Sequence, residues 1–229
     1  MEAFRSEGLR VGFYYSLIDW HHPDFPIDTL HPRRDDADAL QQNEGRDMHK
    51  YAEYMRNQVT ELLTNYGKID ILWFDFSYDG QDGEGDQSWM KGKGKNDWEA
   101  EKLIATARSL QPDIIIDNRT DIEQDLWTPE QYQPVKWVTH PETGELVTWE
   151  ACQTFSGSWG YYRDEQTWKS PEMLIRMLVN TDVYKRQAMG CAGNTDTDVL
   201  KENGKVTFSS QYITNVITDK ALSLSLIHI

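Results

Sequence analysis

The sequence predicts an α/β fold built around a parallel sheet, and three observations support this prediction. An apolar run at residues 69–75 ends in the carboxylate of Asp75, and a loop rich in glycine and aspartate follows it. A second apolar run lies at 113–117, and a segment with helical spacing of apolar residues precedes each run. Strands that alternate with helices form parallel sheets, and such strands are continuously apolar where helices cover them.

The elements expected before Asp75 are a strand and a helix. Residues 9–16 are rich in aromatic, strand-favouring residues, and a polar and aromatic loop at 19–26 follows them. Residues 46–66 place their apolar side chains three and four positions apart, and Gly67 follows as a stop signal. We therefore expect a strand, a loop that lines a site, and a helix that leads into strand 69–75.

The alternation of helices and strands is expected to continue after Asp75 as far as residue 117. A helix at 97–110 precedes the strand at 113–117, whereas residues 118–148 show little periodicity and predict a long functional loop. A fourth strand is expected at 146–154. Ser170 and Pro171 have the residue types of an N-cap and a first helical position, so they predict a helix at 171–180.

Composition limits the class of partner. The chain of 229 residues is 38% hydrophobic, which is enough for one substantial core, and its net charge of −15 argues against nucleic acid or an anionic membrane as partner. The sequence contains no run of 18 apolar residues, so it predicts no membrane-spanning helix. Residues 1–5 lack the apolar stretch of a signal peptide. Nine Trp and eleven Tyr suit a neutral sugar ligand, although most Trp side chains pack in cores.

Asp75 is the first candidate catalytic residue, because acids that end barrel strands are often catalytic. An Asp at this position also commonly caps a helix or forms an Asx-turn. Hydrolysis of a sugar bond needs a second carboxyl group, and the candidates are Glu130 in the segment WTPE and Glu150 in the segment TWE. A carboxyl group close to Trp and away from cations tends to keep its proton, as a general acid requires. The residue pattern does not separate these two. Arg119 follows the strand at 113–117 and suits either a site contact or a surface ion pair.

Other types of site find no support in the sequence. His21 and His22 are adjacent and point to opposite sides of an extended segment, and the acidic residues at 79–86 lack the alternation of a calcium loop. The spacing of Cys152 and Cys191 predicts neither a metal site nor a disulfide framework. No P-loop, dinucleotide fingerprint or Gly-x-Ser-x-Gly motif is present. We expect no metal and no cofactor.

An ordered set of short motifs resembles the α-L-fucosidases of glycoside hydrolase family 29. The resemblance covers roughly residues 5–182, and the motifs are GLRVGFYYS at 8–16, DILWFD at 70–75, NR at 118–119, TPE at 128–130, WE at 149–150 and SWGY at 158–161. The resemblance implies a retaining glycosidase on a (β/α)8 barrel.

The resemblance also implies roles for single residues. Asp75 matches the nucleophile, Glu130 matches the acid/base and is preferred, and Glu150 is the alternative acid/base. Contacts with fucose are implied for Tyr15, Trp73 and Arg119, and Trp159 lies in a segment near the pocket.

The chain departs from the family pattern at both ends. It lacks the early His-His-Asp-Gly type motif and the closing Gly-Gly-Asn type strand, so we expect an incomplete (β/α)8 barrel without its first strands and its last strand. Residues 1–182 are expected to form a partial catalytic barrel. Residues 183–229 are interpreted as a non-family tail, either derived from sequence assembly or disordered. The open edges of such a sheet favour aggregation, and the fragment itself is expected to be inactive.

The predicted function is hydrolysis of terminal α-L-fucosyl linkages in oligosaccharides or glycoconjugates. Two alternatives are a non-catalytic carbohydrate-binding protein on a degenerate barrel and a barrel glycosidase with a different sugar specificity. The resemblance implies a secreted, periplasmic or lysosome-like location. The sequence does not indicate the oligomeric state or the fucosyl linkage preferred.

Overall fold

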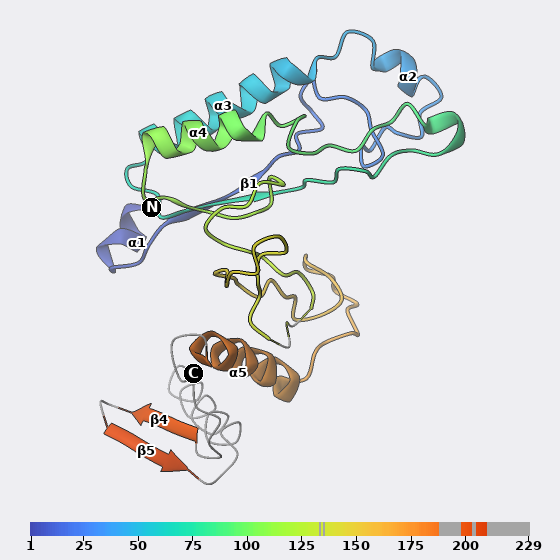
Figure 1. Ribbon diagram of the computed structural model, residues 1–229. Coiled ribbons are helices and arrows are strands. Elements are labelled where there is room, and N and C mark those ends of the chain that lie inside the picture. The colour runs from blue at the N-terminus through green and yellow to red at the C-terminus, as the bar shows by residue number, and fades with distance from the viewer. Residues whose placement is uncertain (133, 135, 188–197, 203–204, 210–229) are drawn as a thin grey trace. The chain divides into compact units, whose positions relative to one another are not determined.

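The computed structural model describes residues 1–132, 134, 136–187, 198–202 and 205–209 (Figure 1). The chain divides into two compact units, Met1–Thr128 and Pro129–Ile229. The first unit carries the parallel sheet, and the second carries a long segment with few regular elements followed by a helix and two strands.

The first unit confirms the expected α/β fold with a parallel sheet. Strands β1 (Gly12–Ser16), β2 (Ile71–Asp75) and β3 (Ile115–Ile116) are parallel and lie in the order β1-β2-β3. The register places Ser16 opposite Asp75, so β1 and β2 end at the same level. The helices of this unit are α1 (Glu2–Ser6), α2 (Ala39–Gln42), α3 (Met48–Asn65), η1 (Gly85–Gln87) and α4 (Ala100–Leu110).

Helix α3 agrees with the helix expected at 46–66. Its N-cap is Asp47, whose side chain accepts a hydrogen bond from the backbone N–H of His49 at 3.0 Å. The buried side chains recur on one face, as the spacing predicts, and Gly67 adopts a positive φ of 74° just after the helix. The buried residues of α3 are Tyr51, Ala52, Met55, Val59 and Leu63.

Helix α4 begins three residues later than expected. Glu99 has a φ of 46°, in the left-handed region, so regular helix begins only at Ala100. Leu103 and Ala107 are fully buried, and α3 and α4 lie side by side along the sheet (Figure 1).

The two faces of β2 have different environments. Leu72 and Phe74 are fully buried and join the core cluster that also contains the buried faces of α3 and α4. Ile71, Trp73 and Asp75 alternate with them and are only partly buried. Since side chains alternate along a strand, Trp73 and Asp75 share the face that α3 and α4 do not cover.

The second unit contradicts the strand expected at 146–154. Among the described residues, this segment forms only isolated bridges, such as Glu130 with Cys152 and Thr139 with Leu146. The N–H of Cys152 donates to the carbonyl of Pro129 at 3.0 Å, and the N–H of Gln131 donates to the carbonyl of Cys152 at 2.9 Å. Pro129 has no N–H of its own to extend this pairing, so no continuous ladder forms.

Helix α5 (Pro171–Gln187) confirms the expected start and extends beyond the expected end at residue 180. The hydroxyl of Ser170 accepts from the N–H of Met173 at 3.2 Å, as an N-cap does. Residues 182–187 contain no Gly or Pro to stop the helix.

Strands β4 (Asp198–Glu202) and β5 (Lys205–Ser209) pair antiparallel within the expected tail. The tail boundary at 183 stays a prediction, and 188–197, 203–204 and 210–229 lie outside the described residues.

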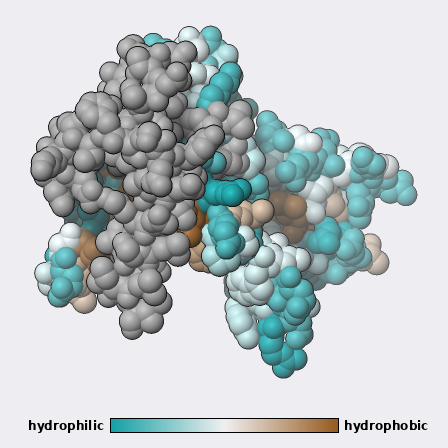
Figure 2. All heavy atoms as spheres, turned by 90° about the horizontal axis from the view of Figure 1, so that it is seen from below, coloured by the Kyte–Doolittle hydropathy of each residue, from teal (hydrophilic) through white to brown (hydrophobic). Residues whose placement is uncertain are grey.

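The described surface is mostly hydrophilic on the face shown in Figure 2, with small hydrophobic patches between. Over the part of the chain that the structure describes, no helix has the length and apolar character needed to span a bilayer.

Candidate active site

Asp75 ends β2 with its carboxylate held by three donors. The Tyr14 hydroxyl donates to Oδ2 at 2.7 Å, the Arg119 Nη1 donates to Oδ1 at 3.3 Å, and the Phe76 N–H donates to Oδ1 at 2.9 Å. The Asp75 side chain keeps 22% of its surface exposed. A carboxylate whose orientation is set by charge-assisted hydrogen bonds, and which still faces solvent, is suited to attack a bound molecule.

Tyr14 and Trp73 form an aromatic surface beside Asp75. Their rings stack at a centroid distance of 5.6 Å and an interplanar angle of 21°, and the register of β1 and β2 pairs the two residues. The Arg119 guanidinium carbon lies 4.9 Å from the centroid of the Trp73 ring, which is a cation–π distance. The site therefore combines an anion, a cation and apolar ring faces.

Arg119 is positioned by groups that follow β3. Its Nε donates to the hydroxyl of Thr128 at 2.5 Å, and its Nη2 donates to the Thr128 carbonyl at 3.4 Å. The side-chain oxygen of Asn118 accepts from the N–H of Thr128 at 3.2 Å, which fixes Thr128 in turn. The side chain of Arg119 is 19% exposed. Arg119 forms an ion pair with Asp75 at the end of β2, and its role as a substrate contact stays a prediction.

Tyr15 lies on the opposite face of the sheet from Asp75. Its hydroxyl donates to Oε1 of Gln58 on α3 at 2.6 Å, and its ring packs edge-to-face on Phe74 at 5.9 Å. Burial is the main cause that raises the pKa of Tyr15 far above its usual value. Of the two adjacent tyrosines, the structure therefore brings Tyr14 to Asp75, and Tyr15 packs against the helices.

Tyr14 is not among the site residues predicted from the sequence, although the sequence contains a signal for it. Side chains on a strand alternate, so only one of Tyr14 and Tyr15 faces the same side as Trp73 and Asp75. The choice between them depends on the register of β1 against β2, and the register is visible only in the folded sheet.

The chain turns sharply after Asp75. Phe76 has a φ of 75° and is 42% exposed. A bulky residue in the left-handed region is strained by on the order of 1–3 kcal/mol, and such strain persists only where the surrounding structure holds it. The turn directs the Phe76 N–H to the Asp75 carboxylate.

The other predicted site residues lie in the second unit. Glu130 is exposed and pairs through its backbone with Cys152. Glu150 is partly buried and follows Trp149, which is fully buried, whereas the Trp159 side chain is 59% exposed. The positions of Glu130, Glu150 and Trp159 are described within the second unit only. No group of three His, Cys, Asp or Glu side chains suited to hold a metal ion occurs among the described residues.

Comparison with known proteins decides the family. A family model described as Alpha-L-fucosidase matches residues 1–184. The chain belongs to the α-L-fucosidase family. A curated α-L-fucosidase of Dictyostelium discoideum is 24% identical over 209 residues, which cover 86% of this chain and 37% of that protein. The chain thus spans well under half the length of this fucosidase.

Solved fucosidase structures agree with the family. Alpha-L-fucosidase isoenzyme 1 from Paenibacillus thiaminolyticus is 42% identical with a TM-score of 0.65, and the match covers 78% of this chain and 42% of that one. The fucosidase AlfC of Lactobacillus casei is 22% identical with a TM-score of 0.56, and the match covers 80% of this chain and 53% of the AlfC chain. At this identity the match supports the fold alone.

Proposed function

We propose that this protein hydrolyses terminal α-L-fucosyl linkages with retention, and that Asp75 is the nucleophile. The observation that carries the proposal is the Asp75 carboxylate at the end of β2, held by Tyr14 and Arg119 beside the Trp73 ring. The ends of parallel strands are the usual place for catalytic groups in barrels, and the family membership of residues 1–184 gives the reaction class. We further propose that the sheet belongs to an incomplete (β/α)8 barrel.

The mechanism is a double displacement. An oxygen of Asp75 forms a bond to the anomeric carbon while the glycosidic bond breaks, and a carboxylic acid gives its proton to the departing oxygen. The same group, then a carboxylate, takes a proton from water, and the resulting hydroxide displaces Asp75 to release fucose. We assign the acid/base to Glu130, with Glu150 as the alternative.

The surrounding side chains have separate roles in this proposal. The hydrogen bonds from Tyr14 and Arg119 hold the Asp75 carboxylate in one orientation before attack. Trp73 offers its ring face to the sugar, and we assign the tyrosine contact to Tyr14 in place of Tyr15. We keep Trp159, which is exposed in the second unit, as a further substrate contact.

A fucosylated glycan is the proposed substrate class. A substituted variant of AlfC has been solved in complex with 4-nitrophenyl-α-L-fucopyranoside and with Fucα(1,6)GlcNAc, so a protein of similar fold binds both an aryl fucoside and a fucosylated sugar. The negative charge of the chain fits a neutral glycan better than a polyanion. Retaining hydrolysis of this type requires no cofactor.

The test compares the wild-type protein with Asp75→Ala on 4-nitrophenyl-α-L-fucopyranoside. The 229-residue chain is assayed together with a chimera in which residues 1–184 replace the matching segment of the Paenibacillus enzyme, since the chain spans 42% of it. We expect turnover by at least one wild-type form, and a loss on the order of 10⁴-fold in Asp75→Ala. Azide restores product formation in that variant as fucosyl azide. If neither wild-type form turns over the substrate, the proposed function is wrong.

The acid/base is identified by a second comparison. Glu130→Gln and Glu150→Gln are assayed on an aryl fucoside with a good leaving group and on a fucosyl disaccharide. Loss of the acid slows the disaccharide far more, because only its leaving group needs protonation. Glu130→Gln should show this difference. If Glu150→Gln shows it and Glu130→Gln does not, the assignment moves to Glu150.

A further inference from the structure

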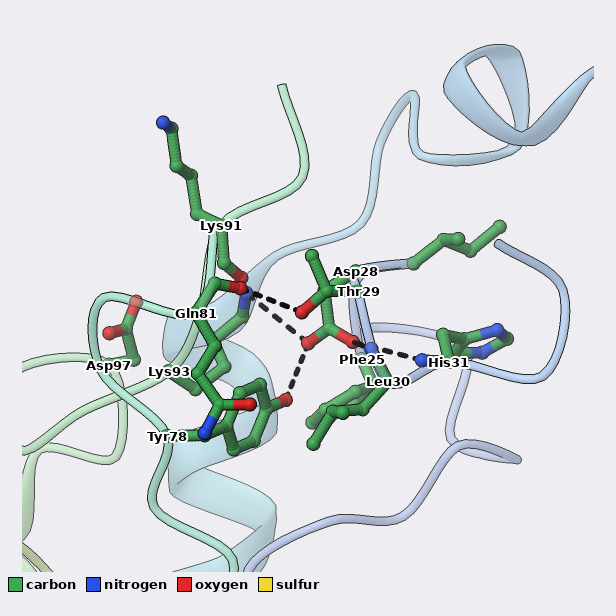
Figure 3. Close-up of polar contacts among 12 residues, drawn as sticks. Phe25, Asp28, Thr29, Leu30, His31, Tyr78, Gln81, Lys91, Lys93 and Asp97 are labelled. Atoms are coloured by element: carbon green, nitrogen blue, oxygen red, sulfur yellow. Dashed lines mark hydrogen bonds and ion pairs between the residues drawn. The ribbon is translucent and has the colours of Figure 1, made fainter. Parts of the chain in front are cut away.

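Asp28 is a fully buried carboxylate that the proposed mechanism does not use. Figure 3 shows it between Tyr78, which donates to Oδ2 at 2.5 Å, and Lys93, whose Nζ lies 3.5 Å from the same oxygen. Tyr78 and Lys93 are each only 4% exposed. We call these three residues the Asp28 cluster.

The remaining oxygen of Asp28 is also satisfied. Oδ1 accepts from the backbone N–H groups of Leu30 and His31, both at 3.1 Å. Burial is the main cause that raises the pKa of Tyr78, and the hydrogen bond to Asp28 adds to it, so its hydroxyl remains a donor. The three hydrogen bonds to Asp28, from Tyr78, Leu30 and His31, are directional, and together they specify one arrangement of the groups that donate them.

The Asp28 cluster joins the two loops that leave the sheet beside Asp75. Asp28 lies in the loop at 17–38 after β1, whereas Tyr78 and Lys93 lie in the loop at 76–99 after β2. The parallel register places Ser16 opposite Asp75, so both loops start at the same end of the sheet. A second link between the same loops is the Thr29 hydroxyl, which donates to the carbonyl of Gln81 at 2.8 Å.

His31 extends the hydrogen bonding to the residue Trp20. Its Nδ1 accepts from the N–H of Arg33 at 3.0 Å, so in the neutral ring the proton lies on Nε2, which is 3.3 Å from the Trp20 carbonyl. Burial is the main cause that lowers the pKa of His31, which favours this neutral form. The loop after β1 is thus held along its length.

Tyr78 connects the Asp28 cluster to the Asp75 carboxylate. It lies three residues after Asp75, and its N–H donates to the carbonyl of Lys93 at 2.7 Å. Between the two lies Phe76, with its φ of 75° and its N–H on Asp75 Oδ1. A strained turn keeps its shape only when the chain on both sides is fixed, and β2 fixes one side while Tyr78 fixes the other.

We propose that Asp28, Tyr78 and Lys93 are positioning residues, which hold the Phe76 turn and through it the orientation of the Asp75 carboxylate. This inference rests on the proposed role of Asp75 as the nucleophile. A buried ion pair adds little stability over apolar groups of the same volume, so the directional hydrogen bonds to Asp28, rather than the strength of its ion pair with Lys93, are what the site requires.

The test is a neutral version of the cluster, Asp28→Asn with Lys93→Met, made in whichever wild-type form turns over the aryl fucoside. The amide oxygen of the introduced asparagine remains an acceptor for the N–H groups of Leu30 and His31, and no charge is left unpaired. Its Nδ2 replaces the oxygen that accepts from the Tyr78 hydroxyl, and the contact with Lys93 is lost, so only the link between the two loops changes. We expect a melting temperature close to that of the wild type, a kcat at least fivefold lower, and a KM within twofold. The rate of covalent labelling by 2-deoxy-2-fluoro-α-L-fucosyl fluoride should fall with kcat.

A matched control removes hydrogen bonds at the other end of β2. The Gln111 side chain accepts from the N–H of Ile69 at 2.8 Å and donates to the carbonyl of Leu63 at 2.8 Å. Gln111→Leu should lower the melting temperature and leave kcat unchanged. Tyr78→Phe, which removes one hydroxyl, serves if the double variant does not fold, and its kcat should fall at least threefold.

The outcomes separate this inference from the proposed function. Absence of turnover and of labelling in both wild-type forms would overturn the proposed function. If kcat of the Asp28→Asn, Lys93→Met variant equals the wild-type value, the positioning role is wrong and the proposed function is unaffected. The same holds for Tyr78→Phe where that variant is used. A fall of kcat in Gln111→Leu equal to that in the cluster variant would likewise overturn it, because the effect would then follow general stability.

Discussion

At the residue scale, the site depends on which side chains share a face of the sheet. Trp73 and Asp75 alternate with the buried residues Leu72 and Phe74, and Tyr14 stands on the same face of β1. The next residue along, Tyr15, contacts Gln58 of α3 instead. Two adjacent tyrosines thus have opposite environments, and this gives an internal control for the role of the hydroxyl at Asp75.

Tyr14→Phe should lower kcat about tenfold, because a hydrogen bond to a charged group contributes roughly 1.5–3 kcal/mol and each 1.4 kcal/mol is a factor of ten. Tyr15→Phe removes an equivalent hydroxyl on the helix-facing side, so it should lower stability and leave kcat unchanged. Steady-state kinetics on the aryl fucoside and thermal unfolding of both variants provide the measurement. An equal effect of the two variants on kcat would refute the assignment to Tyr14.

At the element scale, Glu99 joins α3 to the start of α4. Its carboxylate contacts His49 at 3.0 Å and Lys102 at 3.1 Å, and it also pairs with Arg56. Hydrogen bonding from His49 is the largest cause that lowers the pKa of Glu99 to about 2, from a usual value of 4.5. A carboxyl whose pKa is lowered on folding stabilises the folded state above its unfolded pKa, and this contribution is lost as the pH falls through the folded pKa.

Glu99→Gln should therefore destabilise the protein at pH 7 by roughly 1–3 kcal/mol, the size of a charge-assisted contact. The difference from wild type should shrink below pH 4.5 and vanish near pH 2. Urea unfolding at a series of pH values measures it. Glu101 is exposed in the first turn of α4, and Glu101→Gln is the control that should change little. A difference that does not depend on pH would contradict this account of Glu99.

The prediction of elements succeeded where local signals were strong. The apolar spacing of α3, the cap at Ser170 and the apolar run of β2 all led to elements of the expected type. The strand expected at 146–154 is wrong, because its pairing needs a partner with free backbone N–H groups and Pro129 lacks one. Pairing between distant segments is not encoded in either segment alone.

At the scale of the whole molecule, the first unit contains its own core. The buried residues of the sheet and of α3 and α4 form one cluster within residues 1–128. A unit of this size with a continuous apolar core commonly unfolds cooperatively. The proposed nucleophile and the Asp28 cluster both lie inside this unit.

Residues 1–128 expressed alone should fold and unfold in a single urea transition, followed by circular dichroism. Leu72 is fully buried, and Leu72→Ala should cost about 2–5 kcal/mol in both the isolated unit and the full chain. Equal losses in the two would support an independent core. The absence of a cooperative transition in the isolated unit, or a much smaller loss there, would count against it.

The sequence by itself determined the α/β class, the alternation of β1, α3, β2, α4 and β3, and Asp75 as the candidate acid, because these depend on local periodicity and on residues next to one another in the chain. The tertiary structure decided which tyrosine meets Asp75, how Arg119 reaches it from the segment after β3, and that Asp28 is buried against Tyr78 and Lys93. These contacts join residues more than 40 positions apart, so they depend on strand register and loop packing, which exist only once the sheet has formed.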